Sequence, residues 1–180
     1  TFVTKEQVEE IVKTYPTPFH IYDEKGIREN ARRLKEAFSW NKGYKEYFAV
    51  KATPNPSILR ILKSEGCGAD CSSYTELLMS DKVGIQGSDI MFSSNDTPAC
   101  EFLLAAKLGA TINLDDYTHV QLLKETCGIP ESVSCRYNPG GTFSISTTIM
   151  DNPGDAKYGM TKEQLFKAYV ELRDAGAKRF

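Results

Sequence analysis

The sequence lacks long apolar runs and clusters of basic residues. Its longest apolar stretches, such as FLLAA at 102–106, are far shorter than the roughly 20 residues that a membrane-spanning helix needs. The N-terminus, TFVTKEQVEE, is too charged for a signal peptide. A formal net charge of -2 gives the chain no general attraction to polyanions. These absences predict a cytoplasmic protein that binds neither a membrane nor nucleic acid.

Paired C-x-x-C motifs are also missing. The five cysteines are an odd number, which argues against a disulfide framework and predicts free thiols. Cys67 and Cys71 could be combined with two histidines as metal ligands, but the spacing matches no ordinary zinc site. We therefore predict no metal site, and we expect His20 and His119 at surface or structural positions.

Five apolar runs, each followed by an amphipathic stretch or a long loop, form the main pattern of the sequence. The runs are 47–51, 67–73, 90–94, 110–114 and 133–139. Strands that alternate with helices in this way indicate βαβ units and a parallel sheet. Before the first run, the pattern predicts an amphipathic helix at 5–15 and a short strand at 18–23.

Cap residues mark several of the expected helix starts. Asn55 and Pro56 predict an N-cap followed by the first helical residue. Thr97 and Pro98 predict the same arrangement two units later. Thr161 begins the sequence TKEQ, which is a capping box for the last helix.

Two α/β architectures agree with this order of elements. A doubly wound open sheet is complete with five strands, whereas a (β/α)₈ barrel needs eight units and usually about 250 residues. Length alone favours the open sheet. However, no G-x-G-x-x-G follows the first strand, no G-x-x-x-x-G-K-[ST] occurs, and the polar stretch 140–156 is long for a connecting loop.

Charged residues near the ends of three apolar runs are candidates for one pocket. Strand side chains alternate between faces, and ligands of parallel α/β proteins bind at the carboxyl ends of strands. We therefore expect Lys51, Asp70 and Arg136 to share a site. A structural ion-pair cluster is the alternative. A lysine in this setting can also supply the amine of a Schiff base.

Four motifs give the sequence a family resemblance from about Pro18 onward. In order and spacing they resemble pyridoxal-phosphate-dependent decarboxylases with an alanine-racemase-like barrel, and most of all the diaminopimelate decarboxylases, with ornithine and arginine decarboxylases as relatives. The motifs are FAVKATPNPSILRIL, GCGADCSSYTEL, RYNPG and AKYGMT.

The resemblance implies an α/β fold, a partial (β/α)₈ TIM barrel of the alanine-racemase-like type. About five βα units are present, and this chain does not close the barrel. Residues 1–22 would lead into the barrel, and residues 23–180 would form the N-terminal part of the cofactor-binding domain. The stacking histidine, phosphate loop and C-terminal β-domain of the family are not found. We therefore expect an N-terminal portion that is inactive by itself.

The resemblance also implies roles for individual residues. Lys51 matches the lysine that holds pyridoxal phosphate, and Asp70 matches an acidic residue near it. Glu76 matches a second acidic residue, although an ordinary carboxylate in the first turn of a helix is an equal alternative. Arg136 matches an arginine of the pocket wall that orders these acidic groups.

Three further positions follow from the same resemblance. Lys157 matches a lysine at the interface of a homodimer, in which the partner subunit completes each active site. Ser94 and Asn95 are pocket candidates at the end of the third strand.

The expected reaction is decarboxylation of an amino acid, with meso-diaminopimelate converted to L-lysine as the first choice. The stretch after RYNPG lacks the histidine that diaminopimelate decarboxylases often carry there, which leaves the substrate open. Another basic amino acid, as in ornithine and arginine decarboxylases, is the next choice. A pyridoxal-phosphate-dependent racemase, a non-catalytic homologue and an unrelated open-sheet protein are the remaining alternatives.

Overall fold

The five apolar runs form one parallel sheet with the strand order β1-β2-β3-β4-β5. The computed structural model describes residues 2–142 and 158–180. Each strand after β1 pairs in parallel with the strand that precedes it in the sequence. The strands are β1 (Tyr47–Ala49), β2 (Gly68–Cys71), β3 (Ile90–Ser93), β4 (Thr111–Leu114) and β5 (Val133–Cys135).

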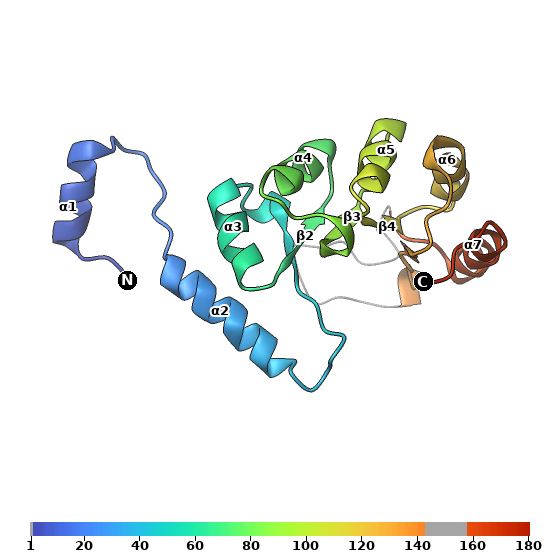
Figure 1. Ribbon diagram of the computed structural model, residues 1–180, viewed down its shortest axis with the longest axis horizontal. Helices are drawn as coiled ribbons and strands as arrows, with labels where there is room; N and C mark the ends of the chain where they lie inside the picture. The colour runs from blue at the N-terminus through green and yellow to red at the C-terminus, as the bar shows by residue number, and fades with distance from the viewer. Residues whose placement is uncertain (1, 143–157) are drawn as a thin grey trace. The chain divides into compact units, whose positions relative to one another are not determined.

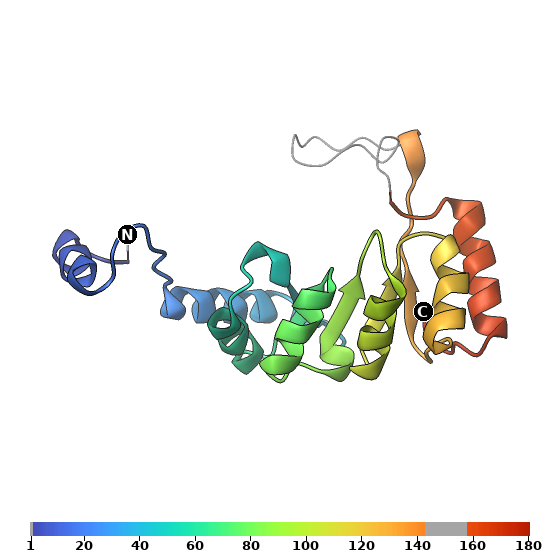
Figure 2. The same cartoon turned by 90° about the horizontal axis from the view of Figure 1, so that it is seen from above.

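Helices α3 to α7 lie along one face of this sheet, in the order of the chain (Figures 1 and 2). They are α3 (Pro56–Ser64), α4 (Tyr74–Lys82), α5 (Ala99–Lys107), α6 (Thr118–Cys127) and α7 (Lys162–Asp174). Short 3₁₀ helices are η1 (Val50–Ala52), η2 (Gly87–Asp89) and η3 (Gly140–Thr142). Among the helices that the structure describes, none is both long and apolar enough to cross a membrane.

Sequential strand order with helices on one face is the topology of a barrel. A doubly wound sheet instead reverses its strand order and carries helices on both faces. The α/β class and the five βα units of a (β/α)₈ barrel are therefore confirmed, and the doubly wound alternative is wrong. In the described residues, β1 and β5 are the outer strands of the sheet, so the barrel is not closed.

Residues after α7 return to the outer edge of β5. The Val133 amide donates to the Arg179 carbonyl over 3.1 Å, whereas the Arg136 amide donates to the Leu114 carbonyl of β4 over 2.9 Å. Successive amides of a strand point to alternate edges, so these two bonds lie on opposite edges of β5. The end of the described chain thus pairs where a sixth barrel strand would lie.

The core lies between the sheet and its helices. Strand residues alternate as expected: Ile90, Phe92, Ile112 and Leu114 are fully buried, and their neighbours face the other way. The free cysteines follow the same pattern, because three of them pack in the core as small apolar residues. Burial raises the pKa of the Cys71 thiol to about 12.

The predicted caps are confirmed at two of three helices. The Asn55 side chain caps α3, and Thr161 forms a reciprocal capping box at the start of α7. The prediction for α5 is wrong by one residue, since Pro98 is the N-cap and Ala99 begins the helix. Pro98 has an extended ψ of 154°, and the Thr97 hydroxyl donates to the Ser94 carbonyl instead of capping the helix.

Contacts divide the chain into two compact units, Thr1–Tyr44 and Lys45–Phe180, and the sheet belongs to the second. The first unit contains α1 (Lys5–Thr14), which confirms the helix expected at 5–15. It also contains α2 (Glu24–Ala37), which was not among the expected elements. Residues 18–23 form no strand in the described chain, so that expectation is wrong. A boundary between residues 22 and 23 stays a prediction.

Candidate active site

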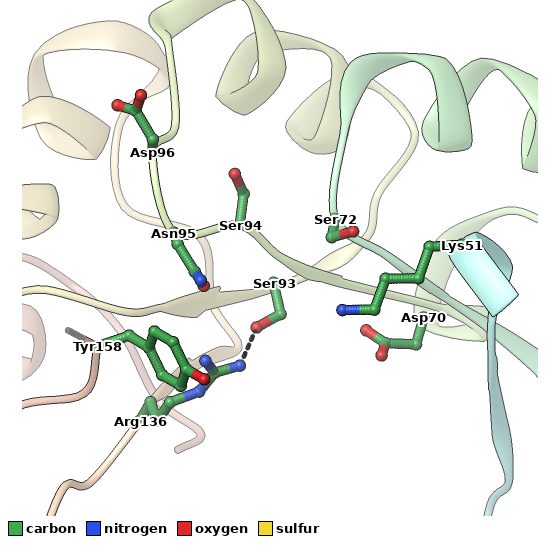
Figure 3. A pocket seen from close by; sticks show the side chains of 9 residues that line it. All are labelled: Lys51, Asp70, Ser72, Ser93, Ser94, Asn95, Asp96, Arg136 and Tyr158. Carbon is green, nitrogen blue, oxygen red and sulfur yellow. Dashed lines mark hydrogen bonds between the residues drawn. The ribbon is translucent and has the colours of Figure 1, made fainter. Parts of the chain in front are cut away.

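A cavity of about 610 Å³ lies at the carboxyl ends of β2, β3 and β5 (Figure 3). Five of the seven predicted site residues line it: Lys51, Asp70, Ser94, Asn95 and Arg136. Glu76 is not among the lining residues, and Lys157 lies outside the described residues. The cavity is also lined by Ser72, Ser93, Asp96 and Tyr158, which sequence reasoning did not select.

Lys51 reaches the cavity because the chain turns immediately after β1. The strand ends at Ala49, and η1 begins with Val50, which is fully buried in the core. The next side chain, Lys51, is exposed and lies on the same side of the cavity as Asp70, with its amine toward Arg136 and Tyr158 on the opposite side (Figure 3). The expectation that Lys51 completes an apolar strand is therefore corrected: it sits on a 3₁₀ turn and is open to solvent in this chain.

Asp70 extends from β2 on the face opposite the buried Ala69 and Cys71, as the alternation predicted. Partial burial raises the pKa of the Asp70 carboxyl above its ordinary value. Lys51 and Arg136 oppose this rise through their positive charges, and the carboxylate of Glu76 adds to it. The fold thus places a partly buried carboxyl group with a raised pKa in the same cavity as the amine of Lys51.

Replacing Asp70 with Asn should raise the free energy of unfolding at neutral pH. A raised pKa means that the folded state binds the proton of Asp70 more tightly than the unfolded state does. The resulting contribution to the free energy of unfolding is fully present at pH values below 3.8, the ordinary pKa of the group. That effect is lost as the pH rises through the folded-state pKa. The gain from Asp70→Asn should therefore shrink as the pH falls from 7 toward 3.8.

Denaturant unfolding at several pH values measures this difference between the wild type and Asp70→Asn. Asp96→Asn is the matched control, since it removes an exposed carboxylate from the same cavity. A loss of stability in Asp70→Asn at pH 7 would mean that the attraction of Lys51 exceeds the cost of burial.

Arg136 is held by groups from three different segments. Its Nη1 lies 2.7 Å from Oδ1 of Asp115, which follows β4, and its Nη2 donates to Oγ of Ser93 over 2.9 Å. The guanidinium carbon lies 5.2 Å from the ring centroid of Tyr158. Asn113 also donates to Ser93 Oγ, over 3.0 Å, which ties β4 to the same point. No ion pair joins Arg136 to Asp70 or Glu76 among the described residues; its carboxylate partner is Asp115.

The segment 158–160 brings Tyr158 to the cavity wall. The Gly159 amide donates to the Asp115 carbonyl over 2.9 Å, and the Met160 amide donates to the Arg136 carbonyl over 2.7 Å. Gly159 has a φ of +95°, and a Cβ there would lie 2.9 Å from the Cβ of Asn138. Only glycine fits this left-handed close approach without strain. The segment therefore fastens the ends of β4 and β5 together beside the site.

Glu76 has a structural position at the start of α4. It accepts hydrogen bonds from the Ser72 amide, over 2.9 Å, and from the Ser73 hydroxyl, over 3.1 Å. Ser73 in turn caps the helix by accepting from the Glu76 amide. This is the helix-start carboxylate that the sequence analysis named as the alternative role. Its remaining link to the site is the electrostatic effect on Asp70.

Two of the missed residues carried a usable signal. Ser93 shares the alternation that selected Asp70, because it lies on the same face of its strand as Met91. Asp115 directly follows the apolar strand β4. The rule that ligands bind at the carboxyl ends of parallel strands, which selected Lys51 and Arg136, therefore applies to Asp115 as well. Tyr158 lies inside the AKYGMT motif, but spacing does not show that it reaches Arg136.

The fold and the cavity define part of a β/α-barrel enzyme domain with an amine at its ligand end. The chain belongs to the family described as pyridoxal-dependent decarboxylase, pyridoxal binding domain, which matches residues 24–176. It is 40% identical over 173 residues to protein TabA of Pseudomonas amygdali pv. tabaci, covering 96% of this chain and 40% of that protein.

Two diaminopimelate decarboxylases are also similar. The Thermoplasma acidophilum protein is 32% identical over 176 residues, covering 96% of this chain and 42% of that protein. The structure of the M. jannaschii enzyme in complex with L-lysine superposes with a TM-score of 0.81 at 27% identity, covering 93% of this chain and 41% of that one. The chain thus spans about two-fifths of the length of these relatives and corresponds to their N-terminal portion.

The predicted cofactor, pyridoxal phosphate, is confirmed by membership of this family. The donor set of the cavity fits such a group. Lys51 offers a primary amine for its aldehyde, Arg136 offers a fixed cation, and the serine and asparagine side chains offer neutral hydrogen bonds.

Proposed function

We propose that the protein is the N-terminal portion of a pyridoxal-phosphate-dependent amino-acid decarboxylase. The observation that supports this most is the position of Lys51, which meets Asp70 and Arg136 at one cavity at the strand ends. Family membership makes decarboxylation the expected chemistry. A structural ion-pair cluster accounts less well for Lys51, because its side chain is exposed and contacts no carboxylate within 4.0 Å among the described residues.

Each cavity residue has a distinct task in this proposal. When bound, pyridoxal phosphate would supply the electron sink for the electrons of the bond between Cα and the carboxylate of the substrate. Lys51 would hold the cofactor through its primary amine. Asp70 would lie beside that amine as a partly buried carboxyl group, whose pKa burial raises above its ordinary value. Arg136 fixes the wall of the cavity on the side of β5.

We propose meso-diaminopimelate as the substrate and L-lysine as the product. The support is the similarity to two relatives that carry the name diaminopimelate decarboxylase. The relative TabA, at 40% identity, bears a different name, so a substrate other than diaminopimelate is the alternative. We also propose that the complete enzyme is a homodimer, with Lys157 near the partner subunit.

Borohydride trapping tests the assignment of Lys51. The sample is an extended protein in which residues 1–180 are joined to the C-terminal part of the Thermoplasma acidophilum diaminopimelate decarboxylase, compared with the 180-residue chain. After incubation with pyridoxal phosphate, reduction and peptide mapping should find the label on Lys51, strongly in the extended protein and weakly in the short chain. An extended protein that folds but carries no label on Lys51 would refute the proposed function.

A further inference from the structure

Asp115 is a buried carboxylate without a complete set of hydrogen bonds. Its side chain is 2% exposed, and its Oδ1 has no hydrogen-bond partner among the described residues. The contact of Oδ1 with Nη1 of Arg136 has ion-pair distance, 2.7 Å, but not hydrogen-bond alignment. A buried carboxylate is costly unless an opposite charge balances it. Arg136 therefore accounts for the presence of this charge beneath the cavity.

The other neighbours of Asp115 do not replace Arg136. His119, from α6, exerts a smaller electrostatic effect on Asp115, and its ring packs edge-on against Phe102 at 5.8 Å. Asp116 repels Asp115 weakly, and its carboxylate accepts hydrogen bonds from the amide and the hydroxyl of Thr118. Arg136 is the only Lys or Arg within 4.0 Å of Asp115 in the part of the chain that the structure describes.

The two contacts of Arg136 fix its plane. One terminal nitrogen faces Asp115 and the other faces Ser93, so the guanidinium is anchored at two points on two neighbouring strands. Tyr158 covers it at 5.2 Å from one side. Figure 3 shows the result: the Tyr158 ring lies beside Arg136, and the end of the guanidinium is bonded to Ser93. A guanidinium fixed in this way retains N–H donors for a ligand.

We propose that Asp115 is a positioning residue that aims the guanidinium of Arg136 at the cofactor in this cavity. The proposal rests on the proposed function, because it requires pyridoxal phosphate to bind beside Lys51. Asp115 itself does not line the cavity but contacts Arg136, which does. Its effect on cofactor binding therefore requires Arg136, and a double-mutant cycle can measure this requirement.

A double-mutant cycle in the extended protein tests the proposal. Binding of pyridoxal phosphate is measured by the absorbance of the Lys51 adduct, and Lys51 labelling by borohydride trapping. Arg136→Gln should weaken binding about tenfold, as the loss of one charge-assisted contact does. Asp115→Asn should weaken it by a similar factor. In the Asp115→Asn background, Arg136→Gln should change binding less than twofold, since the arginine is no longer aimed.

Asp116→Asn is the matched control, with the same change in charge one residue away on an exposed side chain. In that background Arg136→Gln should keep its tenfold effect. Arg136→Lys gives a second test that leaves Asp115 intact: a single ammonium cannot hold both partners, so its binding should match that of Arg136→Gln.

The outcomes separate the two proposals. An unlabelled wild-type extended protein refutes the proposed function. A labelled wild type with normal binding in Asp115→Asn, or with full additivity in the double mutant, overturns the role of Asp115 alone. If Asp115→Asn does not fold, Arg136→Lys decides: binding equal to the wild type overturns the proposal, and binding equal to Arg136→Gln supports it.

Discussion

Replacing Lys51 with Arg in the extended protein should lower the rate of decarboxylation by roughly a thousandfold or more. The substitution keeps the positive charge and much of the length of the side chain. However, a guanidinium stays protonated at all working pH values and offers no nucleophilic amine. The cofactor then has no covalent attachment, and the exchange with the amino group of the substrate cannot occur. Release of carbon dioxide from meso-diaminopimelate measures the effect.

Lys45→Arg is the control for this substitution. Lys45 lies before β1, where its amine pairs with Asp89 at 2.7 Å, and an arginine can make the same pair. Its activity should therefore stay close to that of the wild type. If Lys51→Arg keeps more than about a tenth of the activity, Lys51 is not the residue that holds the cofactor, and the lysine returns to the ion-pair interpretation.

Much of the fold could be predicted because the pattern of the sequence and the packing of the chain depend on the same alternation. The runs around Phe92 and Ile112 place apolar side chains toward the helices, and the polar residues between them must then face the other side. The order of strands and helices predicted the parallel sheet, and the alternation of side chains together with the rule of strand ends predicted one cavity for Lys51, Asp70 and Arg136. The number of barrel units was not fixed by length, and the resemblance to a family supplied it.

The remaining parts depend on geometry that spacing does not contain. The sequence pointed to Asp70 and Glu76 as the acidic groups beside Arg136, whereas the ion pair is made with Asp115, 21 positions before it. The cap of α5 moved by one residue because Pro98 is extended and Thr97 bonds to Ser94. Helix α2 was missed although its signals are present: Asp23 is a good N-cap, and Ile27, Ala31 and Leu34 recur at helical spacing.

The second large effect concerns the chain by itself. We expect no measurable release of carbon dioxide from the 180-residue chain, and activity at least a hundredfold above background from the extended protein. The five described strands leave β1 without a second neighbour, and the face away from the helices carries Tyr47, Met91 and Asn113 around a further hollow of about 380 Å³. In a closed barrel this face is the packed interior. In the described residues, these three side chains are only half-buried.

An open parallel sheet also predicts how the short chain behaves in solution. Unpaired strand edges and an uncovered inner face favour association with other copies, so size-exclusion chromatography should find oligomers or aggregates. The extended protein should elute as a defined species. A short chain that is monomeric and decarboxylates an amino acid would contradict this view, because five βα units would then suffice for the site.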